Sequence, residues 1–149
     1  MSDVFISYAN QDKKLLDEFK RHLKPIARSI SFWDDSKILP GQKWKSEILQ
    51  ALSGCRVGVL FASADFFNSD FIQDIEVPSL LKSAEEKGAV ILTVILKPCL
   101  FSEYEDISQY QAINPPNYTV IEMSEQEREK LWIKLVRRIK TILDDASRK

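Results

Sequence analysis

Hydrophobic residues along the chain form several short runs that predict β-strands. Two runs, Val57–Ala62 and Ala89–Leu96, are apolar at nearly every position. Such runs are typical of strands that are covered on both faces of a sheet. Val4–Tyr8, Ser29–Trp33 and Tyr118–Met123 are β-prone runs of similar length. The pattern therefore predicts five strands.

Between these runs, apolar residues recur at the spacing of a helix. Asn10–Asp12 supplies capping residues ahead of the first helical stripe, and Pro25 marks its end. A second helix begins near Trp44 and ends near Gly54. The first stripe consists of Leu15, Leu16, Phe19, Leu23 and Ile26.

The later helices are also marked by capping and breaking residues. A helical region extends from about Ser69 to Glu86, with Pro78 inside it as a kink or a boundary between two short helices. Gly88 closes it, and Ser124–Glu127 is a capping box that opens the final helix. The apolar stripe of this last helix is Leu131, Leu135, Ile139, Ile142 and Leu143.

Strands that alternate with helices predict an α/β fold, because right-handed crossovers place helices on both faces of a parallel sheet. Five strands favour a flavodoxin-like three-layer sandwich with the order 2-1-3-4-5. In such sheets, ligands bind beyond the carboxyl ends of the strands, near the switch between strands 1 and 3. The loops at that place are Tyr8–Asp12, Asp34–Trp44 and Ser63–Ser69.

Composition excludes several classes of function. The chain has 149 residues, 21 Lys plus Arg and 22 Asp plus Glu, so its charge indicates neither nucleic acid nor an anionic membrane as a partner. Its longest apolar run is far shorter than the ~20 residues that span a bilayer, and Met1–Asp3 opens no signal peptide. We expect one domain over residues 1–149, located in the cytoplasm.

The residues of common metal and nucleophile sites are sparse. Cys55 and Cys99 form no C-x-x-C motif, and the single histidine, His22, lies beside the stripe of the first helix, so we expect structural roles for all three and no metal. The four glycines never cluster, which argues against a P-loop or a dinucleotide fingerprint. A phospho-acceptor receiver domain shares the topology and would use Lys97. That reading lacks the acidic pair for Mg²⁺ after the first strand, where the chain has Ser7–Asn10.

Two features remain open on the residues alone. Glu76 lies four residues after Ile72 on a mostly apolar helical turn, and periodicity by itself favours an ordinary, partly exposed glutamate. Trp33 and Trp44 flank the loop after the second strand, where either could stack on a ligand ring or pack on the sheet.

Several blocks, taken together, resemble the bacterial Toll/interleukin-1 receptor (TIR) domains in order and spacing. The resemblance extends from residue 3 to the final helix, and it implies the flavodoxin-like fold already expected. The blocks are Asp3–Tyr8, Phe32–Asp34, Ile38–Trp44, Ser63–Phe66 and Ser69–Pro78.

This resemblance implies one of two functions. Many bacterial and plant members hydrolyse NAD⁺ to nicotinamide and ADP-ribose or a cyclised variant, whereas many animal members only assemble with other TIR domains. Glu76 matches the glutamate that distinguishes the enzymes, so the resemblance implies an NAD⁺ glycohydrolase with Glu76 as its catalytic residue. Tyr8, Asp34 and Trp44 match positions that line the substrate pocket, and Ile72, four residues before Glu76 in the same block, is expected to bind substrate with them. The alternative is a non-enzymatic module for TIR–TIR contacts.

The expected reaction needs few catalytic residues. Cleavage between ribose and nicotinamide passes through an oxocarbenium-like state, which a nearby anion stabilises. Nicotinamide leaves as a neutral molecule, so one carboxylate suffices and no cofactor or metal is expected. Glu76 could act through electrostatics, through a hydrogen bond to a ribose hydroxyl or through transient covalent attack.

The resemblance also implies partners. TIR enzymes usually act as assemblies, so we expect self-association through the loop that contains Ile38, Leu39, Pro40 and Gly41. Bacterial members commonly work with a sensor of infection, which implies an antiphage immune effector. A fused sensor would follow Lys149, because Met1 lies immediately before the first strand.

Overall fold

The computed structural model describes residues 3–26, 30–34 and 40–147. In this part of the chain, four strands form one parallel sheet in the order β2-β1-β3-β4. The strands are β1 (Val4–Ser7), β2 (Phe32–Trp33), β3 (Val57–Ala62) and β4 (Val90–Ile95). The helices are α1 (Lys13–Leu23), α2 (Trp44–Gly54), α3 (Ala64–Asn68), α4 (Val77–Lys87), α5 (Glu105–Ser108) and α6 (Glu125–Ser147).

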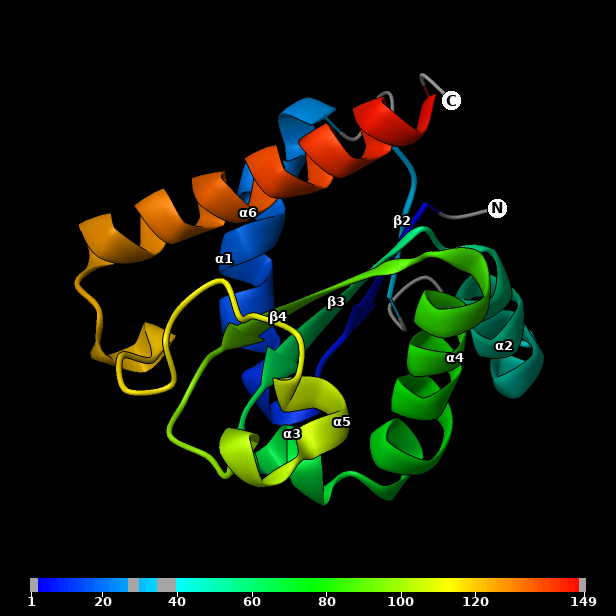
Figure 1. The fold of residues 1–149 in the computed structure, drawn as a ribbon, viewed down its shortest axis with the longest axis horizontal. Coiled ribbons are helices and arrows are strands. Elements are labelled where there is room, and N and C mark those ends of the chain that lie inside the picture. The colour runs from blue at the N-terminus through cyan, green and yellow to red at the C-terminus, as the bar shows by residue number, and fades with distance from the viewer. Residues whose placement is uncertain (1–2, 27–29, 35–39, 148–149) are drawn as a thin grey trace.

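The sheet lies between two layers of helices, as the alternation of strands and helices predicts. Helices α1 and α6 cover one face, and α2 and α4 cover the other (Figure 1). Successive strand residues divide between the two cores, because side chains alternate across a sheet. Val59 and Phe61 of β3 pack with the α1 and α6 side, whereas Leu60 and Ala62 pack with the α2 and α4 side. The three-layer α/β arrangement is confirmed.

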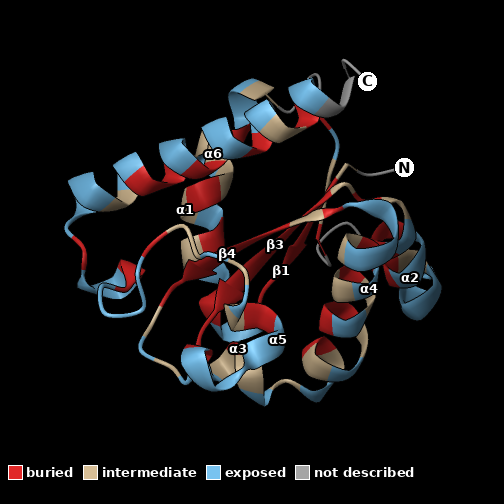
Figure 2. Ribbon diagram, viewed as in Figure 1, coloured by how far each residue is buried: buried red, intermediate tan, exposed pale blue. Residues whose placement is uncertain are grey.

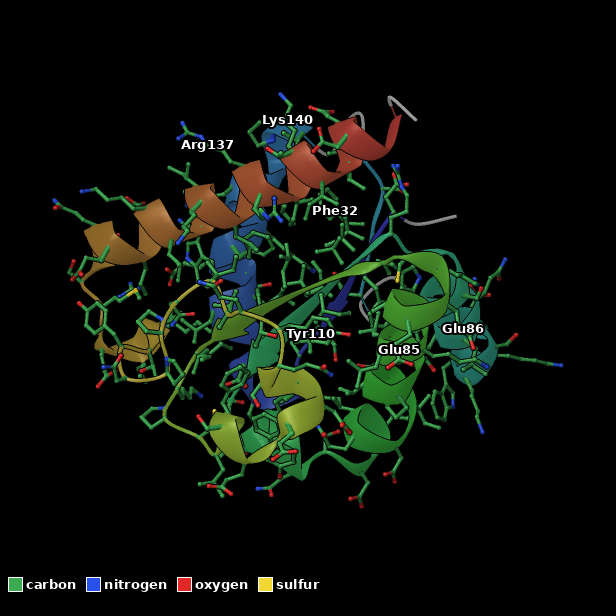
Figure 3. All side chains as sticks on the ribbon, in the orientation of Figure 1. Phe32, Glu85, Glu86, Tyr110, Arg137 and Lys140 are labelled. Carbon is green, nitrogen blue, oxygen red and sulfur yellow. The ribbon has the colours of Figure 1, made fainter. Side chains whose placement is uncertain are left out.

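Burial follows these layers. Buried positions concentrate on the strands and on the inward faces of the helices (Figure 2). Charged side chains such as Glu86 of α4 and Lys140 of α6 extend outward (Figure 3). Trp132 of α6 is fully buried, with its ring centroid 5.6 Å from that of Phe19 and 5.9 Å from that of Phe61. This aromatic cluster joins α1 and α6 to the sheet.

The expected fifth strand, Tyr118–Met123, is not a strand in the structure. Its centre is a 3-10 turn, Val120–Glu122, whose start is capped because Glu122 accepts hydrogen bonds from the backbone N–H and the hydroxyl of Thr119. The apolar pattern is misleading here because Val120 and Met123 are buried from a turn rather than from a strand.

A side chain and two backbone segments cover the outer edge of β4 instead. The buried Asn114 amide accepts a hydrogen bond from Ile95 N–H (2.9 Å) and donates one to the Ile95 carbonyl (3.0 Å). Ala112 forms an isolated bridge with Thr93, and Ile121 N–H donates to the Leu96 carbonyl (2.9 Å). Together these contacts satisfy edge groups that a fifth strand would have paired.

The region around Pro78 also differs from a simple kinked helix. A π-helical turn, Ile72–Glu76, runs directly into α4 at Val77. Pro78 lies directly after the wider π turn, and Glu76 and Val77 before it keep helical dihedral angles, so the helix continues through the proline. Helix α4 ends at Lys87, and Gly88 directly after it adopts a left-handed conformation with φ +75°. Among the helices described, none is both long and apolar enough to cross a membrane.

Candidate functional site

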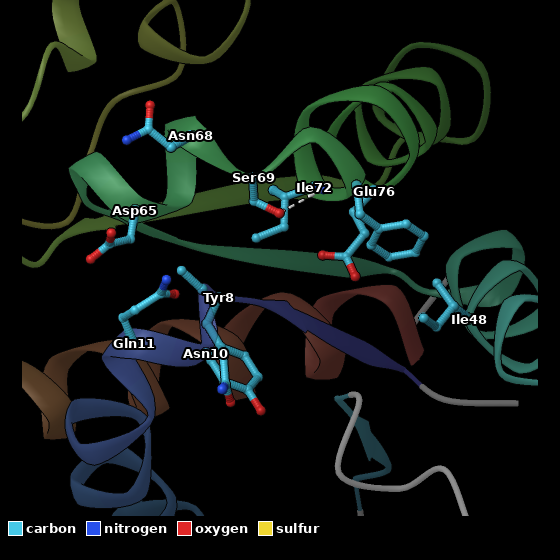
Figure 4. Close-up of a pocket in the computed structure, with 11 residues that line it drawn as sticks. Tyr8, Asn10, Gln11, Ile48, Asp65, Asn68, Ser69, Ile72 and Glu76 are labelled. Atoms are coloured by element: carbon cyan, nitrogen blue, oxygen red, sulfur yellow. Dashed lines mark hydrogen bonds between the residues drawn. The ribbon is translucent and has the colours of Figure 1, made fainter.

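A pocket of about 350 Å³ opens at the carboxyl end of β1 (Figure 4). Its walls come from the segment after β1, from α3 and the residues that follow it, and from Ile48 of α2. Strand β1 lies between β2 and β3, so this is the switch point of the sheet, where ligands of open α/β folds bind. The predicted loops Tyr8–Asp12 and Ser63–Ser69 both contribute lining residues.

Glu76 lines this pocket with a buried carboxylate. Its exposed fraction is 6%, and Ser7 at the end of β1 donates a hydrogen bond from Oγ to Glu76 Oε1 (2.6 Å). Figure 4 shows the Glu76 carboxylate directed toward the side of the pocket that Tyr8 forms. Carboxylates are rarely buried to this extent, because their desolvation is costly. The periodicity-based reading of a partly exposed glutamate is therefore wrong.

Glu76 and Ile72, four residues apart, both line the pocket from one π-helical turn. Val77 N–H donates to the Ile72 carbonyl, five residues earlier, so the turn is wider than in an α-helix. The Ser69 hydroxyl accepts a hydrogen bond from Ile72 N–H (3.3 Å) and holds the start of the turn. Single π turns within helices occur frequently at functional sites, and hydrophobic periodicity gives no signal for them.

The structure brings three of the predicted site residues together. Tyr8, Ile72 and Glu76 all line the pocket, and Tyr8 is buried. Asp34 is not among the described lining residues. Its carboxylate is buried and lies 2.9 Å from Lys20 Nζ of α1.

The two tryptophans that flank the loop after β2 have different environments. Trp33 stacks on Phe5 with a centroid distance of 5.2 Å, so it packs on the sheet. Trp44, the first residue of α2, is 53% exposed and meets the ring of Phe71 edge-on at 5.4 Å. Phe71 lines the pocket, so Trp44 borders the site through Phe71 although it is not among the described lining residues.

The predicted self-association loop is described only in part. Ile38 and Leu39 lie outside the described residues. Pro40 and Gly41 are exposed, and Gly41 has φ +89°, a left-handed conformation that a glycine adopts without strain.

Several polar pocket residues were not predicted individually. Asn10 and Gln11 follow β1, while Asp65, Asn68 and Ser69 belong to or follow α3. The sequence indicates them only through their position: they lie in the loops at the carboxyl ends of β1 and β3, where ligands bind in open α/β sheets. Asp65 and Glu76 are acidic, and the described lining residues include no lysine or arginine. The two carboxylates of the described wall can stabilise a ligand group that carries or develops positive charge.

A buried ionic network holds the two polar walls of the pocket together. Asp12, 1% exposed, lies at the end of the turn that carries Asn10 and Gln11. Lys97, just beyond β4, places its Nζ 2.6 Å from one carboxylate oxygen of Asp12. The Ser63 hydroxyl donates to the other oxygen and also caps α3 by accepting from Phe66 N–H (3.1 Å). The network thus connects the ends of β1, β3 and β4.

The cysteines have the features of structural residues. Cys55 is buried, and burial raises the pKa of its thiol to about 11. Burial also raises the pKa of the Cys99 thiol. A raised pKa disfavours the thiolate, which is the nucleophilic form.

Comparisons with known proteins agree with this architecture. A TIR domain family model matches residues 4–137. The TIR domain of the Toll-related receptor TRR-2 from Hydra magnipapillata superposes with a TM-score of 0.63 at 18% identity, over 94% of this chain and 99% of that one. The TIR domains of the activated Roq1 resistosome, which recognises the pathogen effector XopQ, superpose with a TM-score of 0.57 at 16% identity, over 95% and 85% of the two chains.

One curated relative is a longer protein. The uncharacterized protein y4lF of Sinorhizobium fredii is 30% identical over 101 residues, which cover 66% of this chain and 31% of the relative. The chain thus spans less than a third of that relative. The family match covers most of the chain. The chain belongs to the TIR domain family.

Proposed function

We propose that this TIR domain cleaves NAD⁺ between nicotinamide and ribose, and releases nicotinamide together with ADP-ribose or a cyclised form of it. The observation that carries the proposal is the buried carboxylate of Glu76 in the pocket at the switch point. The fold is shared by TIR domains of either functional class, so the proposal rests on the chemistry of the site.

The reaction needs little from the protein beyond a well-placed anion. The C1′–N bond breaks, its electron pair moves to the nicotinamide nitrogen, and the positive charge of the pyridinium passes to the ribose. Glu76 stabilises that charge, acts on a ribose hydroxyl or attacks C1′ directly. Water or an adenine nitrogen then bonds to C1′, and it displaces the Glu76 carboxylate if that group has attacked. When water is the nucleophile, its proton passes to the Glu76 carboxylate or to solvent. NAD⁺ is the substrate, and the proposal requires no cofactor or metal.

The proposal includes activation by self-assembly. A second copy would contact the segment between β2 and α2, where Pro40, Gly41 and the half-exposed Trp44 are available. The Roq1 TIR domains belong to an activated resistosome, which gives a precedent for TIR domains within an assembly. On this basis we propose an antiphage immune effector that acts in the cytoplasm with a fused or separate sensor.

A second candidate is a TIR–TIR interaction module without catalytic activity. The exposed aromatic surface of Trp44 favours it, because exposed tryptophans are frequent anchors of protein interfaces.

Product analysis distinguishes the two candidates. Wild-type protein, clustered on a multivalent support, should release nicotinamide from NAD⁺, as measured by chromatography. Glu76→Gln should lower the rate by about 100- to 1,000-fold, because it removes the stabilising charge but keeps the side-chain shape. Asp74→Asn is the matched control, since Asp74 lies in the same π turn, is exposed and does not line the pocket.

Two outcomes would contradict the proposed enzyme. Equal nicotinamide release by the wild type and Glu76→Gln would remove Glu76 from the chemistry. No release in any clustered preparation, with self-association intact, would favour the interaction module.

A further inference from the structure

A second cleft adjoins the strand-end pocket. Its volume is about 310 Å³, and it lies between the start of α1, Lys97 beyond the end of β4, and the first turn of α6. Gln11 lines both the pocket and this cleft. Figure 4 shows the Gln11 amide at the margin of the pocket beside Asp65. A ligand longer than the pocket could therefore extend across Gln11 into the cleft.

The cleft contains cations that the described wall of the pocket lacks. Three basic residues, Lys14, Lys97 and Arg128, line it together with two acidic ones, Asp12 and Glu18. The surplus is one positive charge. The pocket wall, by contrast, has two carboxylates and, within its described residues, no cation.

Each of the two acidic residues in the cleft already forms an ion pair. Asp12 pairs with Lys97, and Arg128 Nε lies 2.9 Å from Glu18 Oε1. Burial raises the pKa of the Glu18 carboxyl, but hydrogen bonds from Arg128 and Trp132 outweigh it, and the net pKa is lowered. Glu18 is therefore an anion already held by its neighbours.

Lys14 supplies the surplus charge. It is exposed in the first turn of α1 and forms no ion pair with the described residues. Lys97 contributes as well, because its ammonium has three N–H donors and its side chain is 32% exposed. Together the two lysines can meet an anionic group that enters the cleft from the side of Gln11.

We propose that this cationic cleft binds the diphosphate of a dinucleotide whose nicotinamide riboside end occupies the strand-end pocket. The inference rests on the proposed function and deepens it. NAD⁺ has a cationic pyridinium on one ribose and an anionic diphosphate further along the molecule. The acidic pocket and the neighbouring cleft present the complementary charges in the same order.

The test uses ADP, which contains the diphosphate but no pyridinium. Isothermal titration calorimetry on the full chain should show that Lys14→Gln raises the Kd for ADP about fivefold, as expected for loss of one partly screened charge contact. Lys13→Gln is the matched control, because Lys13 is the adjacent, equally exposed lysine and does not line the cleft. In the clustered protein, Lys14→Gln should raise the KM for NAD⁺ by a similar factor with little change in kcat.

The ADP titration separates failure of this inference from failure of the proposed function. Absence of ADP binding, or an equal effect of the two lysine substitutions, overturns the cleft as a diphosphate site even if NAD⁺ is cleaved. A selective effect of Lys14→Gln on ADP binding supports the site even if Glu76→Gln leaves nicotinamide release unchanged.

Discussion

Glu76 and Asn114 are both buried polar residues at the border of the same sheet, but their surroundings differ. The Asn114 amide forms hydrogen bonds with the backbone. Its oxygen accepts from Ile95 N–H, and its nitrogen donates to the carbonyls of Ile95 and Tyr118. Glu76 accepts a hydrogen bond from the Ser7 hydroxyl and lines an open pocket. Burial of a polar group therefore does not identify a functional site, whereas burial beside a cavity that a ligand can enter is a stronger sign.

The largest expected effect on folding is at Asn114. Asn114→Ala leaves the outward backbone groups of Ile95 without partners, so the free energy of unfolding should fall by about 3 kcal/mol. Urea denaturation followed by circular dichroism would measure this. The fraction that remains folded should cleave NAD⁺ at the wild-type rate.

Glu76→Gln should show the reverse pattern, with lost turnover and nearly unchanged stability, because glutamine can still accept the hydrogen bond from Ser7. If Asn114→Ala abolished turnover of folded protein, or Glu76→Gln were the more destabilised variant, the contrast between the two residues would be wrong.

An intermediate effect on stability is expected at Asp12. Its carboxylate contacts Lys97 and Ser63, and it lies close to the pocket. Asp12→Asn removes the charge that Lys97 and Ser63 hold, and it should cost about 2 kcal/mol of stability. Because the network joins both polar walls, the kcat for NAD⁺ should also fall. Asp17→Asn, an exposed position on α1, is the control. Stability loss with unchanged kinetics would restrict the network to a role in folding.

The smallest effect is expected at Ser7. Ser7→Ala removes one hydrogen bond to the Glu76 carboxylate, which should lower kcat about tenfold if that bond orients the carboxylate. Stability should change by less than about 1 kcal/mol. Ser7→Thr keeps the hydroxyl and should restore most of the rate. Equal rates for all three proteins would show that Glu76 does not depend on Ser7.

Sequence patterns predicted the elements whose signal is local. The buried strands Val57–Ala62 and Val90–Ile95 lie within predicted apolar runs, and the stripes of α1 and α6 face the sheet as their spacing requires. The alternation of elements also located the pocket, because parallel strands end at one edge of a sheet. Only the resemblance to TIR domains indicates Glu76 as a catalytic residue, because helical periodicity by itself predicts a partly exposed glutamate.

Features that depend on partners distant in sequence arise only when the chain has folded. Ser7 and Glu76 are 69 residues apart, and Asp12 and Ser63 are 51 apart. Asp34 matched a pocket position in the sequence, but its carboxylate pairs with Lys20 of α1. An apolar run does not reveal whether a side chain such as Asn114 already covers the neighbouring edge, so the fifth strand was predicted where the chain forms a turn. Local propensity determined which segments became helices and strands, whereas long-range hydrogen bonds and ion pairs determined where each polar side chain lies, because such contacts exist only after distant segments have packed together.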